Sequence, residues 1–498
     1  MAPVPMKSIC ITRAGLALAM AIGLAACGGG GASGYTGNFA SGPVASSGGG
    51  GSTPPPAPTP PASGWAWMSG SSTEGVIGVY GTQGTAASTN VPGSRYSANT
   101  WIDGSGNLWV FGGFGADDTG STLGPLNDLW MFSPASGEWT WKNGNDTVNQ
   151  SGVYGTLGVA AAGNTPGARY GASSWQDAAG FYLFGGDGYD NTSTRGNLSD
   201  LWLYSTSTNE WEWVGGPESE DSGGTYGTLG TATATNWPGA RVDASAATDS
   251  TGNLWLFGGY GDDSTGAAGD LNDLWQYNPL TGEWTWEAGS STVIGRGTYG
   301  AEGVPASSNE PGPRDSAAIW FDSSGDLWLF GGYGADSAAN VGFLNDLWMF
   351  SPTTGEWTWE GGSDLVDQAG AYGTEGTAAS AKWPGARAGD TTWKDASGNI
   401  WMFGGQGFDS TGTAGYLSDL WMYNPSTKAW AWEGGSNLAN QAGTYGTLGT
   451  AASGNIPGGR QYAATIEDGS GNVWMFGGQG DDSNGASGYL NDLWKLTP

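Results

Sequence analysis

The residues of this chain that could do chemistry stand in six equivalent segments, each of which follows a Pro-Gly-x-Arg tetrapeptide. Acidic or tyrosine side chains occupy these segments where other copies have small residues, at Asp243, Asp315, Asp390, Tyr96, Tyr170 and Tyr462. Carboxylates that share one site raise each other's pKa and can act as general acid and base. We therefore treat the six residues as candidates for ligand binding and the three aspartates as candidates for catalysis. The alternative is that they are simply solvated.

The absence of histidine limits the chemistry that is available. The sequence contains no His, and its two cysteines are Cys10 and Cys27, so the commonest general base and metal ligand is missing. The close similarity of the copies also argues against catalysis, because a reaction centre needs unlike groups that converge on one point. The positions at which the copies differ are therefore the places to look for a site.

A second set of aspartates recurs once per copy at intervals of 73 residues. This aspartate ring comprises Asp117, Asp190, Asp263, Asp336, Asp409 and Asp482. Calcium binds clustered carboxylate and carbonyl oxygens, so a calcium site is chemically possible here. The spacing is not that of an EF-hand, and Asp or Asn in glycine-rich loops commonly caps a turn. Calcium and turn capping are thus the two interpretations, and no other cofactor is indicated.

Each copy also contains one arginine and one aspartate in fixed positions. The arginines are Arg95, Arg169, Arg241, Arg314, Arg387 and Arg460, and the aspartates are Asp128, Asp200, Asp273, Asp346, Asp419 and Asp492. Because the chain has few cations, a repeated arginine slot indicates a structural charge pair within each copy. An arginine ring that binds a ligand around a channel is the alternative.

These residues are positioned by one unit that is repeated six times after about residue 64. In the third copy, short apolar and aromatic runs cover residues 238–249, 253–259, 271–279 and 282–289, and Gly, Pro, Asn and Asp bound them. Such runs predict β-strands, and the lack of a sustained 3.6-residue period predicts few helices. Six units of four antiparallel strands predict an all-β fold, a six-bladed β-propeller.

The motifs of each copy resemble the kelch repeat. A Phe-Gly-Gly triplet is followed by Asn/Ser-Asp-Leu-Trp and a later Trp; the triplets begin at Phe111, Phe184, Phe257, Phe330, Phe403 and Phe476. The resemblance covers about residues 65–498 and implies a kelch propeller of the galactose oxidase central-domain superfamily. A WD-type propeller fits less well, because the chain has no His for that family's Gly-His signature.

The two ends of the repeated region complement each other. Trp65-Ala66-Trp67 matches the Trp-x-Trp pair that ends each later copy, whereas the sequence stops at Pro498 where another pair would follow. Unpaired strand edges are unfavourable, so we expect a strand around residues 64–69 to close the last blade. A seventh, partial blade that stays open is the alternative.

The Trp-x-Trp pairs and a long insertion complete the unit. Trp139 and Trp141 fall on one face of a strand, so we expect such pairs to pack between blades; a carbohydrate-binding platform is the alternative. The connections from second to third strand and from fourth strand to the next copy are both long, and the latter carries a Tyr-Gly-Thr-Leu-Gly-Thr motif or a relative of it. Strand alternation places both on one face, where we expect the ligand.

The amino-terminal part of the chain predicts export. Lys7 and Arg13 accompany an apolar run, residues 14–26, that is too short to span a bilayer. Leu24-Ala25-Ala26-Cys27 resembles a bacterial lipobox, although an ordinary signal peptide with a chance cysteine is the alternative. We expect residues 1–26 to be a lipoprotein signal peptide, Cys27 the lipidated residue, 27–63 a flexible Gly/Ser/Pro tether and 64–498 the propeller. Gly28 implies, by resemblance to lipoprotein sorting, the outer membrane, on its periplasmic side or at the cell surface.

The formal net charge of −31 disfavours a nucleic-acid partner, since phosphate binding needs a basic surface. The expected function is a binding or scaffolding module for a polysaccharide or for a surface or extracellular protein, with membrane contact through the lipid anchor alone. The alternative is a glycan-modifying enzyme that uses the aspartates at the channel. The copper centre of galactose oxidase needs histidines and a tyrosine joined to a cysteine, so that activity is not expected. Kelch propellers also include a sialic-acid epimerase, but no constellation in this sequence maps onto it.

Overall fold

A computed structural model describes residues 64–497 apart from residue 121. The expected signal peptide, Cys27 and tether lie outside the described residues. All regular elements among the described residues are β-strands. None of those residues belongs to a helix long and apolar enough to cross a membrane. The prediction of an all-β fold is confirmed.

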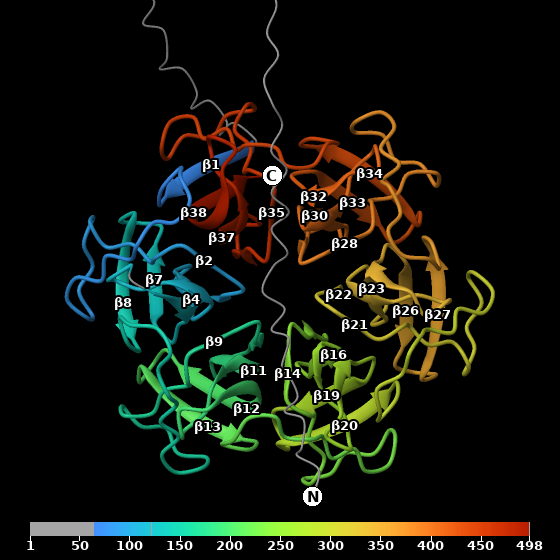
Figure 1. Cartoon of the computed structure of the whole chain (residues 1–498), viewed down its shortest axis with the longest axis horizontal. Helices are drawn as coiled ribbons and strands as arrows, with labels where there is room; N and C mark the ends of the chain where they lie inside the picture. The colour runs from blue at the N-terminus through green and yellow to red at the C-terminus, as the bar shows by residue number, and fades with distance from the viewer. Residues whose placement is uncertain (1–63, 121, 498) are drawn as a thin grey trace, which may run out of the picture. The chain divides into compact units, whose positions relative to one another are not determined.

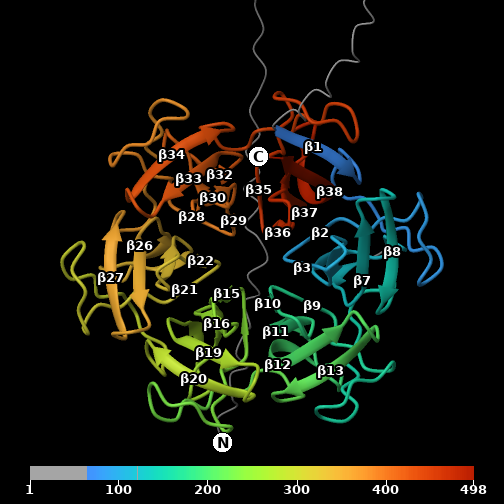
Figure 2. The ribbon, with the colours of Figure 1, turned by 180° about the vertical axis from the view of Figure 1, so that it is seen from behind.

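Five copies of the unit each supply four main strands to an antiparallel sheet, and the last copy supplies three that are joined by β1. The innermost strands, which lie nearest the centre in Figure 2, are β3 (Asn99–Ile102), β10 (Ser173–Gln176), β15 (Ser245–Thr248), β22 (Ala318–Phe321), β29 (Thr391–Lys394) and β36 (Ala464–Glu467). The second strands are β4 (Leu108–Phe111), β11 (Phe181–Tyr189), β16 (Leu254–Phe257), β23 (Leu327–Phe330), β30 (Ile400–Phe403) and β37 (Val473–Asp481). The third strands are β7 (Leu129–Ser133), β12 (Arg195–Ser205), β19 (Leu274–Asn278), β26 (Leu347–Ser351), β33 (Leu420–Asn424) and β38 (Ser487–Thr497). The outer strands are β8 (Glu138–Asn143), β13 (Glu210–Gly215), β20 (Glu283–Ala288), β27 (Glu356–Gly361), β34 (Ala429–Gly434) and β1 (Gly64–Ser69).

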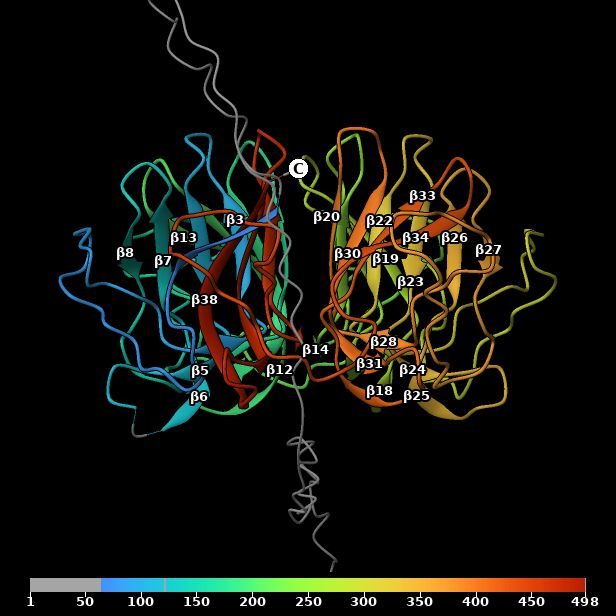
Figure 3. The same ribbon diagram turned by 90° about the horizontal axis from the view of Figure 1, so that it is seen from above.

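A smaller sheet accompanies the main one at one face of the molecule, the lower edge in Figure 3. A short strand precedes each innermost strand: β2 (Arg95–Tyr96), β9 (Arg169–Tyr170), β14 (Arg241–Val242), β21 (Arg314–Asp315), β28 (Arg387–Ala388) and β35 (Arg460–Gln461). In four copies it pairs with a separate hairpin: β5 (Phe114–Ala116) with β6 (Leu123–Pro125), β17 (Tyr260–Asp262) with β18 (Ala268–Asp270), β24 (Tyr333–Ala335) with β25 (Val341–Phe343), and β31 (Gln406–Phe408) with β32 (Ala414–Tyr416). In the other two copies the long strands β11, β12, β37 and β38 run through both regions.

The described strands thus form ten sheets: four of three strands, four of four strands and two of five strands. Figure 1 shows the repeated four-stranded arrangement disposed around a central axis, with order β22-β23-β26-β27 from the centre outward in one copy. Repeated four-stranded antiparallel sheets in this arrangement are consistent with a β-propeller.

The first and last strands of the described region pair with each other, as predicted. β1 runs antiparallel to β38, with Trp65 opposite Leu496 and Trp67 opposite Trp494. Figure 1 shows the two strands side by side although they come from opposite ends of the sequence. This pairing covers an edge of β38 that would otherwise expose unpaired backbone groups.

The core between neighbouring copies is aromatic. Trp139 of β8 is 1% exposed, and its ring centroid lies 5.2 Å from that of Phe132 and 5.4 Å from that of Phe476, a residue of the last copy. Burying such a ring removes about 150–250 Å² from water. Trp141 is only half-buried, and its indole N–H donates to the carbonyl of Asn143 at 2.8 Å. The prediction that the tryptophan pairs pack between copies is confirmed most fully for the first member of the pair.

The long insertion takes a different course from the one predicted. It follows the outer strand of its own copy instead of standing free on one face. In the first copy, the Gly84 N–H donates to the Trp141 carbonyl at 2.8 Å and the Asn90 amide to the Trp139 carbonyl at 3.2 Å. The physical reason is that β8 is an edge strand, whose carbonyls need donors. The start of the insertion does meet the loop between second and third strands, where the Gly78 N–H donates to the Asp117 carbonyl at 3.3 Å, and only its later part follows the outer strand.

Candidate functional site

The segments after the six arginines meet at the centre of the molecule in a closed circle of backbone hydrogen bonds. The second residue after each arginine donates its N–H to the carbonyl of the equivalent residue in the preceding copy, over distances of 2.7 to 3.1 Å. This central circle consists of Ser97, Gly171, Asp243, Ser316, Gly389 and Tyr462, and the Ser97 N–H closes it on the Tyr462 carbonyl. It ties every copy to both of its neighbours at the axis.

The central circle requires a left-handed backbone at each of its positions. The φ angles lie between 49° at Ser97 and 65° at Gly389. For residues other than glycine this conformation is unfavourable by roughly 1–2 kcal/mol. The hydrogen bonds of the circle offset this cost, because each is made only when the backbone turns here. The turn also splits the predicted first strand into two, as in β14 and β15.

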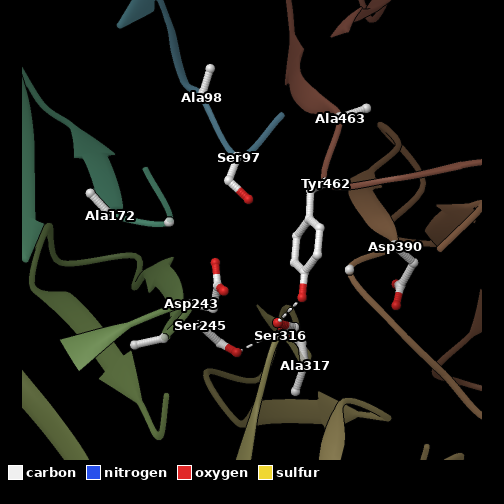
Figure 4. A pocket seen from close by; sticks show the side chains of 13 residues that line it. Ser97, Ala98, Ala172, Asp243, Ser245, Ser316, Ala317, Asp390, Tyr462 and Ala463 are labelled. Carbon is white, nitrogen blue, oxygen red and sulfur yellow. Dashed lines mark hydrogen bonds between the residues drawn. The ribbon is translucent and has the colours of Figure 1, made fainter. Parts of the chain in front are cut away.

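A cavity of about 190 Å³ lies above the central circle, on the side of the innermost strands. Its wall combines members of the circle with small residues from the start of the innermost strands. Figure 4 shows Ser97, Asp243, Ser316 and Tyr462 reaching into the centre from different sides. We call this space the central cavity. Its side chains differ from copy to copy, unlike most of the molecule.

Tyr462 spans the central cavity toward another copy. Its hydroxyl lies 2.9 Å from the Ser316 hydroxyl, and Ser316 in turn donates to a carboxylate oxygen of Asp315 at 2.8 Å. The Tyr462 ring lies over Gly389, where a Cβ would come within 3.0 Å of it. Burial, followed by the nearby charges of Asp243 and Asp315, raises the pKa of Tyr462 well above its usual value. Tyr462 is therefore held neutral, with its hydroxyl fixed in the cavity.

Asp243 presents a carboxylate to the central cavity without a protein partner. Among the described residues, no donor forms a hydrogen bond to this carboxylate, which leans over Gly171. A Cβ at Gly171 would come within 2.4 Å of its Oδ1. Asp243 keeps some contact with solvent through the cavity, yet protein surrounds it. Desolvation, with added repulsion from Asp315 and Asp187, raises its pKa well above the usual value.

Two further polar groups of the cavity wall also lack partners. The Ser97 hydroxyl and both carboxylate oxygens of Asp390 are buried and form no hydrogen bond with other described residues. Desolvation raises the pKa of Asp390 to about 7, although the charge of Arg387 partly offsets it. A buried polar group without a partner costs roughly 1–3 kcal/mol. Such groups mark a place where a ligand or water can supply the missing partners.

The structure separates the six predicted candidates into three levels. Asp243 and Tyr462 belong to the central circle, and Asp390 follows it by one residue. Tyr96, Tyr170 and Asp315 precede it and lie on the side of the small sheets. The sequence analysis expected the segments that hold these residues to line a channel, and the structure places only Asp243, Asp390 and Tyr462 in the wall of the central cavity. The left-handed turn explains the difference, because it redirects the chain between these positions.

An aromatic cluster occupies the axis below the central circle. The ring centroid of Tyr96 lies 5.6 Å from that of Phe114, 5.8 Å from that of Tyr170 and 5.1 Å from that of Tyr489. Burial raises the pKa of Tyr96 and of Tyr170. Tyr96 and Tyr170 are thus brought together, and the Tyr96 ring centroid lies 6.0 Å from that of Tyr462.

One charged pair near this cluster was missed by the sequence analysis. Asp187 of β11 accepts a hydrogen bond from Arg195 of β12 at 2.7 Å, and the Arg195 guanidinium lies 5.8 Å from the Tyr170 ring centroid. Burial raises the pKa of Asp187, and Arg195 acts in the opposite direction. The available signal was that Arg195 is the one basic residue in any connection between second and third strands.

The repeated arginines and aspartates form six buried ion pairs within their own copies. In the fourth copy, the two terminal nitrogens of Arg314 donate to the two carboxylate oxygens of Asp346 at 2.7 and 2.8 Å. The same carboxylate accepts from the Tyr299 hydroxyl and the Trp348 indole, both at 2.7 Å. The other pairs are Arg95–Asp128, Arg169–Asp200, Arg241–Asp273, Arg387–Asp419 and Arg460–Asp492. None of these arginines lines the central cavity. The tyrosine that donates to each aspartate, such as Tyr299, also recurs once per copy, but its bond to the ion pair was not predicted from the sequence.

The aspartate ring closes loops in the structure. In the third copy, Asp263 accepts hydrogen bonds from the Thr265 and Ala267 backbone at 2.7 and 3.0 Å, and from the Val293 backbone at 2.9 Å. Burial alone would raise its pKa, but these donors lower it to about 2. Asp117, Asp190, Asp336, Asp409 and Asp482 accept equivalent bonds from their own loops. Within the described residues no group of three or more His, Cys, Asp or Glu could hold a metal ion. The calcium site stays a prediction.

Comparison with protein-family models finds no family that matches this chain. Part of the chain is similar to the N-acetylneuraminate epimerases of Escherichia coli strain K12 and Shigella sonnei strain Ss046, and to N-acetylneuraminate epimerase 2 of Escherichia coli O6:H1. Each is 29% identical over 180 residues, which is 32% of this chain and 42% of the relative. The chain therefore matches less than half the length of these curated relatives. The name of these relatives describes an epimerase of N-acetylneuraminate.

Proposed function

We propose that this chain is a six-bladed kelch-type propeller that binds a carbohydrate in its central cavity. Support for six blades comes from the six repeats of the sequence and from the central circle, in which one residue of each repeat takes part. The pairing of β1 with β38 supports closure of the last blade by the amino-terminal strand. Partial similarity to sugar epimerases supports the ligand class.

The observation that carries this proposal is the set of unlike, unpartnered polar groups in the cavity wall. Asp243 and the Ser97 hydroxyl reach toward the centre of the cavity without a hydrogen-bond partner among the described residues, while Tyr462 and Ser316 offer hydroxyls that donate or accept. A sugar carries several hydroxyl donors on one compact ring, so it can satisfy these groups together. Hydrogen bonds to charged acceptors contribute about 1.5–3 kcal/mol each.

The size of the central cavity favours one sugar unit over an extended chain. A volume of about 190 Å³ lies below the roughly 300–1,000 Å³ of common small-molecule pockets. The backbone of the central circle narrows the cavity at one end, and the Tyr462 side chain extends across the remaining space. We therefore propose that the terminal unit of a glycan enters from the side of the innermost strands. The long-loop face, where the sequence analysis placed the ligand, lies on the other side of the central circle and carries the aromatic cluster.

Saturation-transfer NMR with the full chain tests this proposal. Glucose, galactose and N-acetylglucosamine are the probes, and Asp243→Asn is the variant. Asn is chosen because it tolerates the left-handed backbone of this position better than most residues. We expect saturation transfer from the protein to at least one probe and about tenfold weaker binding in the variant. Absence of transfer to all three sugars, or identical affinity in the variant, would contradict the proposal.

A second function, modification of a glycan, is favoured by one specific observation. Asp243 lies in the cavity wall, and burial raises its pKa well above the usual value, which favours the protonated form that a general acid needs. The relatives are named for an epimerase, and Tyr462 lies in the same cavity. Incubation of a bound glycan with the full chain, followed by NMR of the sugar, separates the two functions. Conversion that disappears in Asp243→Asn indicates an enzyme, whereas an unchanged sugar spectrum indicates a binding module.

The place of the protein in the cell is a separate proposal. We propose that the chain is exported, lipidated at Cys27 and carried on the tether of residues 27–63, at the outer membrane. A polysaccharide or a surface protein would then be the partner within reach. The support is the sequence pattern of residues 1–28 alone.

A further inference from the structure

The charged residues that line the central cavity are all acidic. Two of the thirteen residues that line it, Asp243 and Asp390, are acidic, and none is basic. Asp315 is linked to the cavity through Ser316 at 2.8 Å, and Asp187 and Asp315 both act on Asp243. A ligand that enters therefore meets the Asp243 carboxyl group, with Asp390 also in the wall, and no lining cation.

The basic residues nearest to this region are already paired. The Arg387 guanidinium donates to both carboxylate oxygens of Asp419, at 2.8 and 2.7 Å, and its side chain is fully buried. Arg195 is paired with Asp187 at 2.7 Å, on the other side of the central circle. An anionic sugar would have to break one of these pairs to gain a cation, whereas a cationic group needs only the carboxylates that are present.

We infer that the central cavity selects a sugar that carries a free amine over its neutral counterpart, and disfavours an acidic sugar. This inference rests on the proposed carbohydrate function. An ammonium group has three donors and no acceptor, which matches the unpartnered Asp243 carboxylate and the Ser97 hydroxyl above the central circle. Charge-assisted hydrogen bonds of this kind are about twice as strong as neutral ones. The sugar class suggested by the name of the relatives is an acid, so this chain would differ from them in ligand charge.

Proton release gives the inference an independent signature. The groups that face Asp243 are Asp187 and Asp315, which are acidic, and Tyr96, Tyr170 and Tyr462, which stay neutral. Because burial raises the pKa of Asp243, this carboxyl group binds a proton more tightly in the empty cavity than an exposed aspartate does. A bound ammonium group favours the charged carboxylate, so uptake of an amine-bearing sugar releases a proton and uptake of a neutral sugar does not.

Isothermal titration calorimetry of the full chain tests the inference. The probes are a chitosan trisaccharide, the matched N-acetylated chitin trisaccharide and N-acetylneuraminate, each in two buffers that differ in ionisation enthalpy. We expect the chitosan trisaccharide to bind about tenfold more tightly than the chitin trisaccharide, with proton release, and N-acetylneuraminate to bind most weakly. In Asp243→Asn the two trisaccharides should bind about equally.

A matched control separates this site from the general attraction of an acidic protein for cations. Glu375→Gln removes the same unit of charge from an exposed position in an insertion at the rim, and it should leave the affinity ratio unchanged. Equal loss of the ratio in both variants, or acidic-sugar binding as tight as amine-sugar binding, overturns the inference. Equal binding of the two trisaccharides by the unmodified chain overturns this inference but leaves the proposed function standing. Absence of binding by every probe overturns both.

Discussion

The buried cluster around Asp346 provides a quantitative test of what holds each copy together. Tyr299→Phe removes one hydroxyl that donates to Asp346 at 2.7 Å and leaves the ring in place against Trp348, with centroids 4.8 Å apart. Asp346 keeps its bonds from Arg314 and Trp348, so no buried charge loses its counter-charge. The loss is one hydrogen bond to a charged acceptor, about 1.5–3 kcal/mol of unfolding free energy.

Comparison variants make this magnitude interpretable. Asp346→Asn removes the counter-charge of the buried Arg314 and should cost more, about 3–5 kcal/mol. Tyr226→Phe removes the equivalent hydroxyl of the third copy, which donates to Asp273 at 2.6 Å, and should cost the same as Tyr299→Phe. Tyr189→Phe alters a half-buried tyrosine outside these clusters and should change the free energy by less than about 0.5 kcal/mol.

The assay is urea unfolding followed by tryptophan fluorescence, with the slope of the transition compared among variants. Equal slopes allow shifts of the midpoint to be read as changes in stability. The reasoning is refuted if Tyr299→Phe costs no more than Tyr189→Phe. It is also refuted if Asp346→Asn is tolerated as well as Tyr299→Phe, because the pair would then not hold a buried arginine in place.

Three further predictions concern other parts of the chain. Because burial raises the pKa of Asp390 from its ordinary 3.8 to about 7, its contribution to stability is fully present below about pH 4 and is lost as the pH rises through 7. Asp390→Asn should therefore melt like the unmodified chain at low pH but be more stable by up to about 4 kcal/mol at pH 8, and parallel pH profiles would contradict this. Asn236→Ala removes amide bonds to the Thr231 and Trp284 carbonyls at 2.9 and 3.0 Å; it should speed proteolysis within residues 227–235, and an unchanged cleavage rate would show that the insertion is held by other contacts. Cys27→Ser should abolish labelling by a radioactive fatty acid in the native host, whereas persistent labelling would exclude lipidation at this residue.

Much of the fold could be predicted from the sequence because its signals are local and repeated. The aromatic runs with turn residues at their ends predicted the four main strands. Trp65-Ala66-Trp67, which belongs to no preceding copy, predicted the pairing of β1 with β38. The left-handed turns at Ser97, Asp243 and Tyr462 could not be predicted in this way. They are stabilised by hydrogen bonds between copies, which exist only once the chain has closed on itself.

The candidate site was predicted in part for the same reason. Asp243, Asp390 and Tyr462 stood out as departures from the repeat, and the structure brings them to one cavity. Their relation to Ser97 and Ser316 depends on the central circle, since serine is unremarkable at both positions in the sequence. The course of the insertion also escaped prediction, because its partners are backbone carbonyls of an outer strand, which carry no sequence signal.

The most direct test of the central claim is a glycan-array measurement with the full chain, its Asp243→Asn variant and the Glu375→Gln control. If the central cavity binds a terminal sugar, the unmodified chain and the control should bind the same defined set of glycans, and Asp243→Asn should lose or weaken that set. Binding of no glycan by the unmodified chain, or binding that Asp243→Asn leaves unchanged, would contradict the account.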